Sequence, residues 1–288
     1  MFNRFVATFL IFLALAGCSR PEAVHPAFWL VEGPKGEKAW LLGTIHALPR
    51  PVDWRSTKID AAIGEANLLV LEVADITDDS KTAQAFAALS RSPGLPPLNQ
   101  RVPENLRPEL ADGLRQGGIK AGALDSYETW AAALMLQNAL AASGESDTGN
   151  GIDRAVAKAW KGPVTEFEGA TAQLAIFDRL PEPQQRALLG AVLTEGPGRT
   201  KQLQSLQTAW ARGDVDLIAR VTDEDFGNEP ALREALLLGR NRAWTSEVEA
   251  MLAQGSRPFI AVGAAHLAGK DGLPAMLAAR GWKVTRLQ

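Results

Sequence analysis

The chain has 288 residues, of which 46% are hydrophobic, 22% charged and 7% aromatic. This composition is ordinary for a globular protein and excludes collagen-like, prion-like and wholly disordered chains. Thirty Lys and Arg against 33 Asp and Glu give a formal net charge of -3. Nothing in this balance indicates nucleic-acid binding, which usually needs a concentrated basic face. A single Cys excludes a disulfide framework and a Cys-rich zinc site, and three His leave few places for His-based chemistry.

The first residues predict a targeting segment. Arg4 precedes an uncharged apolar run over residues 5–16, which is too short for a bilayer span of about 20 residues but is typical of a signal-peptide core. The run ends in Leu-Ala-Gly before Cys18, which resembles the lipobox of bacterial lipoproteins. We therefore expect residues 1–17 to be a lipoprotein signal peptide and Cys18 to be acylated. The alternative is an ordinary secretory signal with a coincidental Cys.

Residues 18–27 are predicted to be a short tether, because they contain two prolines and no hydrophobic period. His25 falls in this stretch as a solvated residue, and by analogy with bacterial sorting Ser19 favours the outer membrane. We expect one domain over residues 28–288, held at the periplasmic face of the outer membrane with its lipid as partner and with no transmembrane helix.

Two segments at opposite ends of the chain share one layout. The first is an apolar run that closes on Gly43-Thr-Ile-His46. A helical stripe follows with Asp53 as its predicted N-cap, and an apolar strand over residues 67–73 returns with Glu72 at its end. The apolar positions of the stripe are Ile59, Ala62, Ile63 and Ala66.

The second segment is an apolar run that closes on Gly263-Ala-Ala-His266. Asp271 is the predicted N-cap of the next helix, Gly281 stands where a C-cap glycine is favoured, and residues 282–287 are predicted to be the closing strand. The stripe of this helix is Leu273, Met276, Leu277 and the aliphatic stem of Arg280.

The predicted fold class is therefore α/β. Two halves, each with a strand–loop–helix–strand unit, are expected around a mostly parallel sheet. Ligands bind such sheets beyond the carboxyl ends of the strands, where both motif His lie. Gly43 and Gly263 allow a sharp exit from the strand, or a close backbone approach that a Cβ would obstruct.

Between the two units the pattern becomes helical. We expect a mostly α-helical insertion over about residues 100–250, with a strand over residues 162–169 that carries Glu168 at its end. A capping box at residues 125–128 predicts one helix start, and the Pro-rich segment 93–108 predicts a surface loop. Further helical stripes are expected within Ile152–Trp160, Leu174–Phe177, Leu203–Trp210 and Leu232–Leu252.

The two motif histidines are candidate metal ligands. A lone His at a strand end is more often structural, but here His46 and His266 occupy the same motif at the same predicted place. If the strand ends share one cleft, the two imidazoles converge. Two imidazoles with a carboxylate suit Zn²⁺, Mn²⁺ or Fe²⁺. Such a metal activates water and polarises a carbonyl group.

The candidate carboxylates are Glu72 and Glu168, each at the end of a predicted strand, where a ligand or a general base is expected. Each can also be a solvated or salt-bridged residue. The segment Arg240-Asn241-Arg242 can bind a carboxylate or a developing oxyanion. The alternative interpretation of this segment is a charged, solvent-exposed helix face, with Trp244 in the core.

Together these motifs resemble the TraB/GumN family, over about residues 28–287. The chain is also similar to the Tiki metalloproteases and, more distantly, to erythromycin-esterase-like and ChaN-like lipoproteins. The segments that carry the resemblance are Leu41–His46, Leu69–Glu72, Phe167–Gly169 with Gln173–Phe177, Arg240–Arg242 and Val262–Leu267.

The resemblance implies a two-halved α/β fold with a helical insertion. It also implies metal-dependent peptide cleavage by the two Gly-x-x-His motifs with a glutamate, and Mn²⁺ or Co²⁺ as the metal. Carried over to this chain, His46 and His266 become metal ligands and Glu72 a ligand or general base. Arg240 and Asn241 become candidates to orient the substrate.

Three hypotheses about function follow. The first is a lipid-anchored periplasmic metal-dependent hydrolase, a peptidase acting on a peptide or small molecule through metal-activated water. The second is a lipoprotein that binds haem or another iron complex through the two imidazoles. The third is a metal-free accessory protein of the cell envelope. All but the third require the two motifs to share one pocket.

Overall fold

The computed structural model describes residues 21–74, 79–142, 146–194, 196–227 and 229–288. The predicted signal peptide and Cys18 lie outside these ranges. Within them, no helix has both the length and the apolar character that a bilayer span requires.

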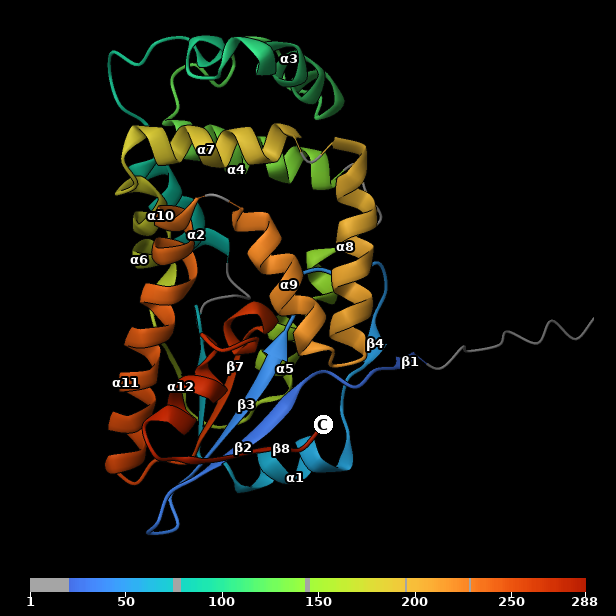
Figure 1. Cartoon of the computed structure of the whole chain (residues 1–288), viewed down its shortest axis with the longest axis vertical. Coiled ribbons are helices and arrows are strands. Elements are labelled where there is room, and N and C mark those ends of the chain that lie inside the picture. Colours follow the sequence, from blue (N-terminus) through green and yellow to red (C-terminus); the bar gives the residue numbers. More distant parts are fainter. Residues whose placement is uncertain (1–20, 75–78, 143–145, 195, 228) are drawn as a thin grey trace, which may run out of the picture.

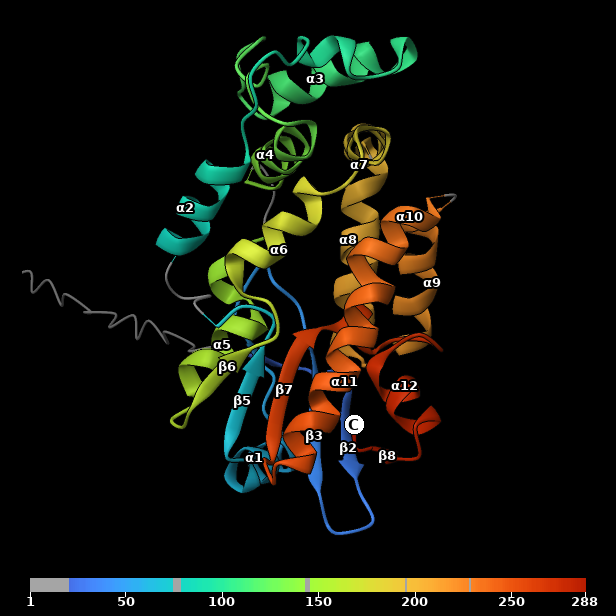
Figure 2. The same ribbon diagram turned by 90° about the vertical axis from the view of Figure 1, so that its left-hand side faces the viewer.

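A six-stranded sheet forms the base of the molecule, in the order β6-β5-β7-β3-β2-β8 (Figures 1 and 2). The four strands β6, β5, β7 and β3 pair in parallel, and β2 is antiparallel to both of its neighbours, β3 and β8. The mostly parallel sheet with helices around it confirms the predicted α/β class. The strands are β2 (Phe28–Glu32), β3 (Lys38–Thr44), β5 (Leu68–Leu71), β6 (Val164–Glu166), β7 (Pro258–Gly263) and β8 (Lys283–Arg286).

The two motif strands are neighbours in this sheet. β3 and β7 pair in parallel, with Gly43 opposite Val262 and Thr44 opposite Gly263. β5, which precedes Glu72, pairs with the other side of β7. The strands of the two units therefore alternate within one sheet, and β3, β5 and β7 end at the same edge (Figure 2).

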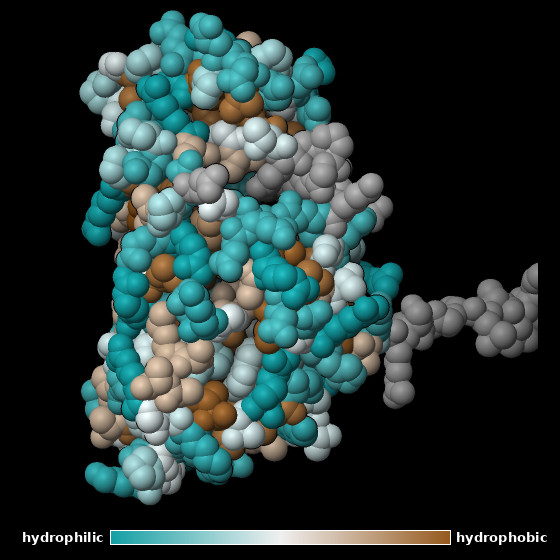
Figure 3. All heavy atoms as spheres, viewed as in Figure 1, coloured by the Kyte–Doolittle hydropathy of each residue, from teal (hydrophilic) through white to brown (hydrophobic). Residues whose placement is uncertain are grey.

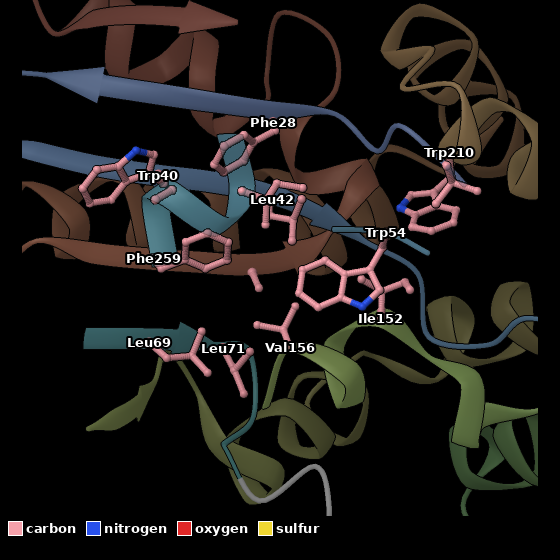
Figure 4. Close-up of a cluster of buried hydrophobic side chains, with 14 of the residues drawn as sticks. Phe28, Trp40, Leu42, Trp54, Leu69, Leu71, Ile152, Val156, Trp210 and Phe259 are labelled. Atoms are coloured by element: carbon pink, nitrogen blue, oxygen red, sulfur yellow. The ribbon is translucent and has the colours of Figure 1, made fainter. Parts of the chain in front are cut away.

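Successive side chains of each strand enter opposite cores. Leu42 and Ala261 belong to the core on one face, with side chains of α1 (Thr57–Glu65) and α5 (Ile152–Ala159). Leu41 and Val262 belong to the core on the other face, against α11 (Gly239–Ala253) and α12 (Leu273–Ala279). Figure 4 shows the first core, in which Phe28, Trp40, Leu42 and Phe259 gather above Leu69, Leu71 and Val156.

The helical region covers the carboxyl edge of the sheet (Figure 1). It has apolar cores of its own, built from five helices between residues 79 and 194, and it returns to the sheet through α8 and α9. Its helices are α2 (Asp79–Leu89), α3 (Arg107–Gln116), α4 (Thr129–Ala142), α6 (Gly169–Asp178), α7 (Glu182–Thr194), α8 (Gly196–Ala211), α9 (Val215–Phe226) and α10 (Pro230–Arg233). Short 3-10 turns are η1 (Leu98–Gln100), η2 (Glu104–Leu106), η3 (Thr148–Asn150) and η5 (Ala264–Leu267), and η4 (Glu234–Leu238) is a π-helix.

Two predicted N-caps were wrong. Asp53 lies in the short strand β4 (Val52–Asp53), and the cap of α1 is Ser56, whose hydroxyl accepts the Ile59 N–H. Gly272 precedes α12, while the Asp271 carboxylate pairs with Arg233. Capping requires an extended backbone directly before the helix, a dihedral condition that residue type alone does not satisfy.

Three further segments differ in detail from expectation. The Asp125 carboxylate accepts the Leu98 N–H, and α4 begins only at Thr129. The segment 93–108 contains the turns η1 and η2, and α3 begins inside it. Within the predicted tether, β1 (Glu22–Ala23) pairs with β4 and Val24 and Ala27 are buried, while the exposed His25 donates its backbone N–H to Ala211.

Trp210 joins the helical region to the sheet, and its loss tests this connection. The indole of this buried residue donates to the Gly43 carbonyl at 2.9 Å. We expect Trp210→Phe to lower the free energy of unfolding by about 1–3 kcal/mol, because that carbonyl is left unpaired. Trp210→Ala should cost about 3–5 kcal/mol. Urea denaturation checks both, and Leu203→Ala, at an exposed position of the same helix, should change stability by less than about 0.5 kcal/mol.

Candidate functional site

Two cavities meet at the carboxyl edge of the sheet. The larger has a volume of about 550 Å³ and is lined by both motif histidines, and the smaller has about 270 Å³. They share Thr44, His46, Glu72 and Gln173. The structure therefore brings the two Gly-x-x-His motifs to one pocket, as the first two hypotheses require.

Gly263 is the point around which the site is arranged. A Cβ at this position would lie 3.3 Å from Glu72 Oε1 and 3.8 Å from both His46 Nε2 and His266 Cδ2. The Gly263 N–H donates to Glu72 Oε1 at 2.8 Å. Any larger residue would fill the space that the two rings and the carboxylate face.

Gly43 has the corresponding role in the other motif. A Cβ there would lie 3.2 Å from the Ala264 Cβ, so the glycine lets β3 approach the turn that carries His266. Of the two predicted reasons for these glycines, a sharp exit from the strand or a close approach, the distances agree with a close approach.

His46 is held by Asp153, a buried residue in the first turn of α5. The Nδ1 atom of the ring lies 2.7 Å from Asp153 Oδ2. Desolvation is the largest single influence on this ring and lowers its pKa. The hydrogen bond and charge of Asp153, with the charge of Glu72, raise the pKa of His46 above its ordinary value of 6.5. The bond also leaves Nε2 facing the pocket.

The backbone fixes this pair. The Ile152 N–H donates to the Ile45 carbonyl, which ties the start of α5 to the loop that carries His46. Gly151 permits the contact, because a Cβ there would lie 2.4 Å from the His46 carbonyl oxygen and 2.7 Å from Asp153 Oδ1.

His266 is buried and neutral. Burial and the positive charges of Arg240 and His46 lower its pKa to about 3, although the charge of Glu72 acts in the opposite direction. Asn241 donates its amide N–H to the Asp271 carbonyl, so its Oδ1 faces His266 Nδ1 at 2.6 Å. In this amide orientation Nδ1 carries the proton and Nε2 is left as an acceptor.

Arg240 occupies the centre of the charged groups. Its guanidinium donates to Glu72 Oε2 at 2.7 Å, to both oxygens of Glu168 at 2.7 and 2.9 Å, and to His266 Nε2 at 3.1 Å. Burial opposes its charge, but the two carboxylates outweigh burial and raise its pKa. Burial also disfavours the charged form of Glu72 and by itself raises its pKa. The opposing influences are stronger and lower this pKa to about 2: they are the charges of His266 when protonated, of Arg240 and of His46, and the Gly263 N–H.

The helix before Arg240 departs from α geometry. The π-helix η4 runs directly into α11, and such π segments occur often at functional sites. The guanidinium lies over the Trp244 ring at 4.6 Å, and this ring stacks on Phe167 at 4.8 Å and contacts the His266 ring at 4.4 Å. Trp244 thus lies in the core, as the alternative interpretation of this segment predicts. Its ring also contacts Arg240 and His266 of the site.

The three residues of the segment Arg240-Asn241-Arg242 have three different environments. Arg240 lines the larger cavity, whereas Asn241 is fully buried behind His266 and Arg242 is exposed and paired with Glu234. Glu168 lies beside Arg240 and lines neither of the two cavities. Of these three residues of α11, Arg240 is therefore the one that lines the pocket.

Sequence reasoning missed Asp153, Gln173 and Thr44 as site residues. Asp153 stands in the first turn of a helix, where an acidic residue is common for reasons of the helix dipole alone. Gln173 donates to Glu72 Oε2 at 3.2 Å, and the buried Thr44 hydroxyl has no hydrogen-bond partner within the described residues. The one available signal for Thr44 was its place inside the Gly-x-x-His motif.

Comparison with known proteins decides the family. The sequence model of the TraB/PrgY/gumN family matches residues 27–286. The chain belongs to this family. Two relatives are similar over most of the chain: the uncharacterized protein YbaP of Shigella flexneri is 28% identical over 85% of this chain and 89% of its own length. The uncharacterized protein YbaP of Escherichia coli K12 is 29% identical over 82% of this chain and 86% of its own length. No solved structure matches the chain.

Two imidazoles and one carboxylate are the kinds of group that bind divalent metals in proteins. The two imidazoles each bind a partner through Nδ1, which is the usual arrangement that orients a metal-binding His. Glu72 and both rings also face the space that a Gly263 Cβ would fill. In the described part of the chain, no three His, Cys, Asp or Glu side chains are grouped closely enough to hold a metal ion. Arg240 contacts both Glu72 and His266.

Arg240 forms ion pairs with two largely buried carboxylates, those of Glu72 and Glu168. Replacing Arg240 tests how strongly these ion pairs stabilise the fold. We expect Arg240→Gln to lower the free energy of unfolding at pH 7 by about 3–5 kcal/mol. The folded-state pKa of Glu72 lies below 4.5, so its stabilising effect is present above pH 4.5 and is lost as pH falls towards 2. Without the cation this pKa rises, and the difference between variant and wild type should shrink as pH falls from 7 to 4.

Guanidinium denaturation at both pH values measures this effect. Arg242→Gln is the matched control, because Arg242 lies two residues away in an exposed ion pair and should change stability by less than about 1 kcal/mol. Equal losses in the two variants would contradict the assigned role of Arg240.

Proposed function

We propose that this protein is a metal-dependent hydrolase of peptide or other amide bonds, whose site is the pocket around Gly263. The observation that carries the proposal is the convergence of His46 Nε2, Glu72 Oε1 and the His266 ring on one point that only a glycine leaves open. Membership of the TraB/PrgY/gumN family agrees with the proposal through the resemblance to Tiki metalloproteases noted above.

His46, His266 and Glu72 would hold the ion, with Mn²⁺, Co²⁺ or Zn²⁺ as candidates. When bound, such an ion lowers the pKa of water and polarises a carbonyl group. Glu168 is not favoured as a ligand, because it lines neither of the two cavities, whereas Glu72 lines both.

The remaining residues have roles of their own. Glu72 is ionised and accepts a proton from water if it is not itself a ligand. Arg240 lines the pocket beside His266, so we assign it to the stabilisation of a developing oxyanion. Asn241 and Asp153 hold the two rings, so we assign both to positioning.

The location of the protein is part of the proposal. The sequence of residues 1–18 favours export and acylation of Cys18, followed by anchoring at the periplasmic face of the outer membrane. Labelling with a radioactive fatty acid, lost in Cys18→Ser, tests this part independently of the hydrolase site.

Ligand substitutions test the hydrolase directly. We expect His46→Ala and His266→Ala to abolish stoichiometric metal binding and to lower hydrolysis of a casein or peptide-library substrate at least about a hundredfold. His25→Ala is the matched control, because this exposed His lies outside the pocket. Unchanged metal content and hydrolysis in both motif variants would refute the proposal.

Asp153 should govern the pH dependence of metal binding. His46 must lose its proton to bind a metal, so affinity should increase with pH between 6.5 and the raised pKa of about 9. Asp153→Asn should move this dependence to lower pH and weaken metal binding about 10–100-fold. Titration calorimetry at pH 6, 7 and 8 measures both effects, and a pH profile identical to wild type would contradict the role of Asp153.

Haem binding and a metal-free accessory role remain the alternatives. The position of Glu72 beside the space between the rings favours a small ion over a porphyrin. A Soret band on haem titration, lost in either His variant, would support the haem hypothesis. Elemental analysis without bound metal, with function intact in both variants, would support the accessory role.

A further inference from the structure

We propose that the larger cavity binds a bulky apolar group of the substrate directly beside the bond that is cleaved. This inference rests on the proposed hydrolase function and names the class of its substrate. The group is a leucine- or phenylalanine-like side chain of a peptide, or an acyl chain that presents the same aliphatic chemistry.

The wall of the cavity carries the proposal. Four large apolar side chains come from four different elements: Ile176 from α6, Leu206 from α8, Phe226 from α9 and Leu236 from η4. None of them belongs to the four apolar cores of the described residues. Their apolar surface is therefore turned to the cavity and not into the packing of the fold.

Apolar side chains elsewhere on the surface are arranged differently. On the face in Figure 3 they lie in small groups among polar residues, as is normal for a soluble domain. The cavity, by contrast, gathers apolar groups around a volume of about 550 Å³, which lies within the usual range of ligand pockets. Such a pocket gains most from a ligand that displaces its water with aliphatic or aromatic surface.

The position of the cavity makes it a specificity pocket. The same space is lined by His46, Glu72 and Arg240, so a group bound against Leu206 or Leu236 is adjacent to the site of chemistry. Its polar members away from that site are Thr222 and Asp225 of α9.

The smaller cavity adjoins the same site. Thr82, Thr148 and Arg154 line it, and it joins the larger one at Thr44. The buried hydroxyl of Thr44, which has no partner in the described structure, stands at this junction and can donate to or accept from a peptide group. Polar groups of the substrate next to the apolar group can therefore bind here.

The test compares substrates that differ only in this group. Fluorogenic peptides with Leu, Phe, Ala or Asp beside the cleaved bond, and N-acyl amides with octanoyl or acetyl chains, are incubated with the metal-loaded full chain. We expect kcat/KM for Leu, Phe or octanoyl to exceed that for Ala, Asp or acetyl by about ten- to a hundredfold. If the preference is larger in the peptide series, the apolar group is an amino-acid side chain. If it is larger in the N-acyl amide series, the group is an acyl chain.

Leu206→Trp narrows the cavity and should reduce this preference about tenfold, with most of the loss in KM. Leu203→Trp is the matched control, because Leu203 is 42% exposed one turn earlier on the same helix. The control should leave the preference unchanged.

Binding without turnover separates this inference from the hydrolase proposal. His46→Ala removes a proposed ligand but no apolar wall residue, so calorimetry should still detect tighter binding of the Leu peptide than of the Ala peptide. If this preference is found while wild type hydrolyses nothing, the hydrolase proposal fails and the apolar pocket stands. Equal binding of the two peptides, or no binding of either, would overturn the apolar pocket whatever the rate of hydrolysis.

Discussion

The parallel pairing of β3 with β7 is the constraint on which the rest of the structure depends. Because Thr44 stands opposite Gly263, the two Gly-x-x-His motifs leave the sheet at the same level and on the same edge. Motifs from opposite ends of the chain thereby become neighbours. The usual position of ligands beyond the carboxyl ends of parallel strands then follows from the topology.

The charges of the site balance one another through a single guanidinium. Glu72 and Glu168 are largely withdrawn from water, and two adjacent buried carboxylates are unfavourable without a cation. Arg240 satisfies both and also donates to His266. The charge of Arg240 lowers the pKa of Glu72 and also lowers the pKa of His266, so it favours an ionised carboxylate beside a neutral imidazole.

The sheet and the helical insertion contribute different properties. The strand ends supply the imidazoles and Glu72 on a rigid base, whereas the apolar wall of the larger cavity comes from α6, α8, α9 and η4. The wall residues Ile176, Leu206, Phe226 and Leu236 can therefore vary without moving the residues at the strand ends. This division is common where one fold carries several functions.

The sequence by itself determined the α/β class, the family, both motif histidines and the strand-end Glu72, because apolar runs and motif spacing are local properties of the chain. It missed β2 and the caps of two helices, which depend on pairing and backbone dihedral angles. Only the tertiary structure decided that Asp153 holds His46, that Asn241 faces His266 and not the pocket, and that Arg240 joins Glu72 to Glu168. Those contacts link residues 25 to 168 positions apart, and no local pattern records which distant charges fold against each other.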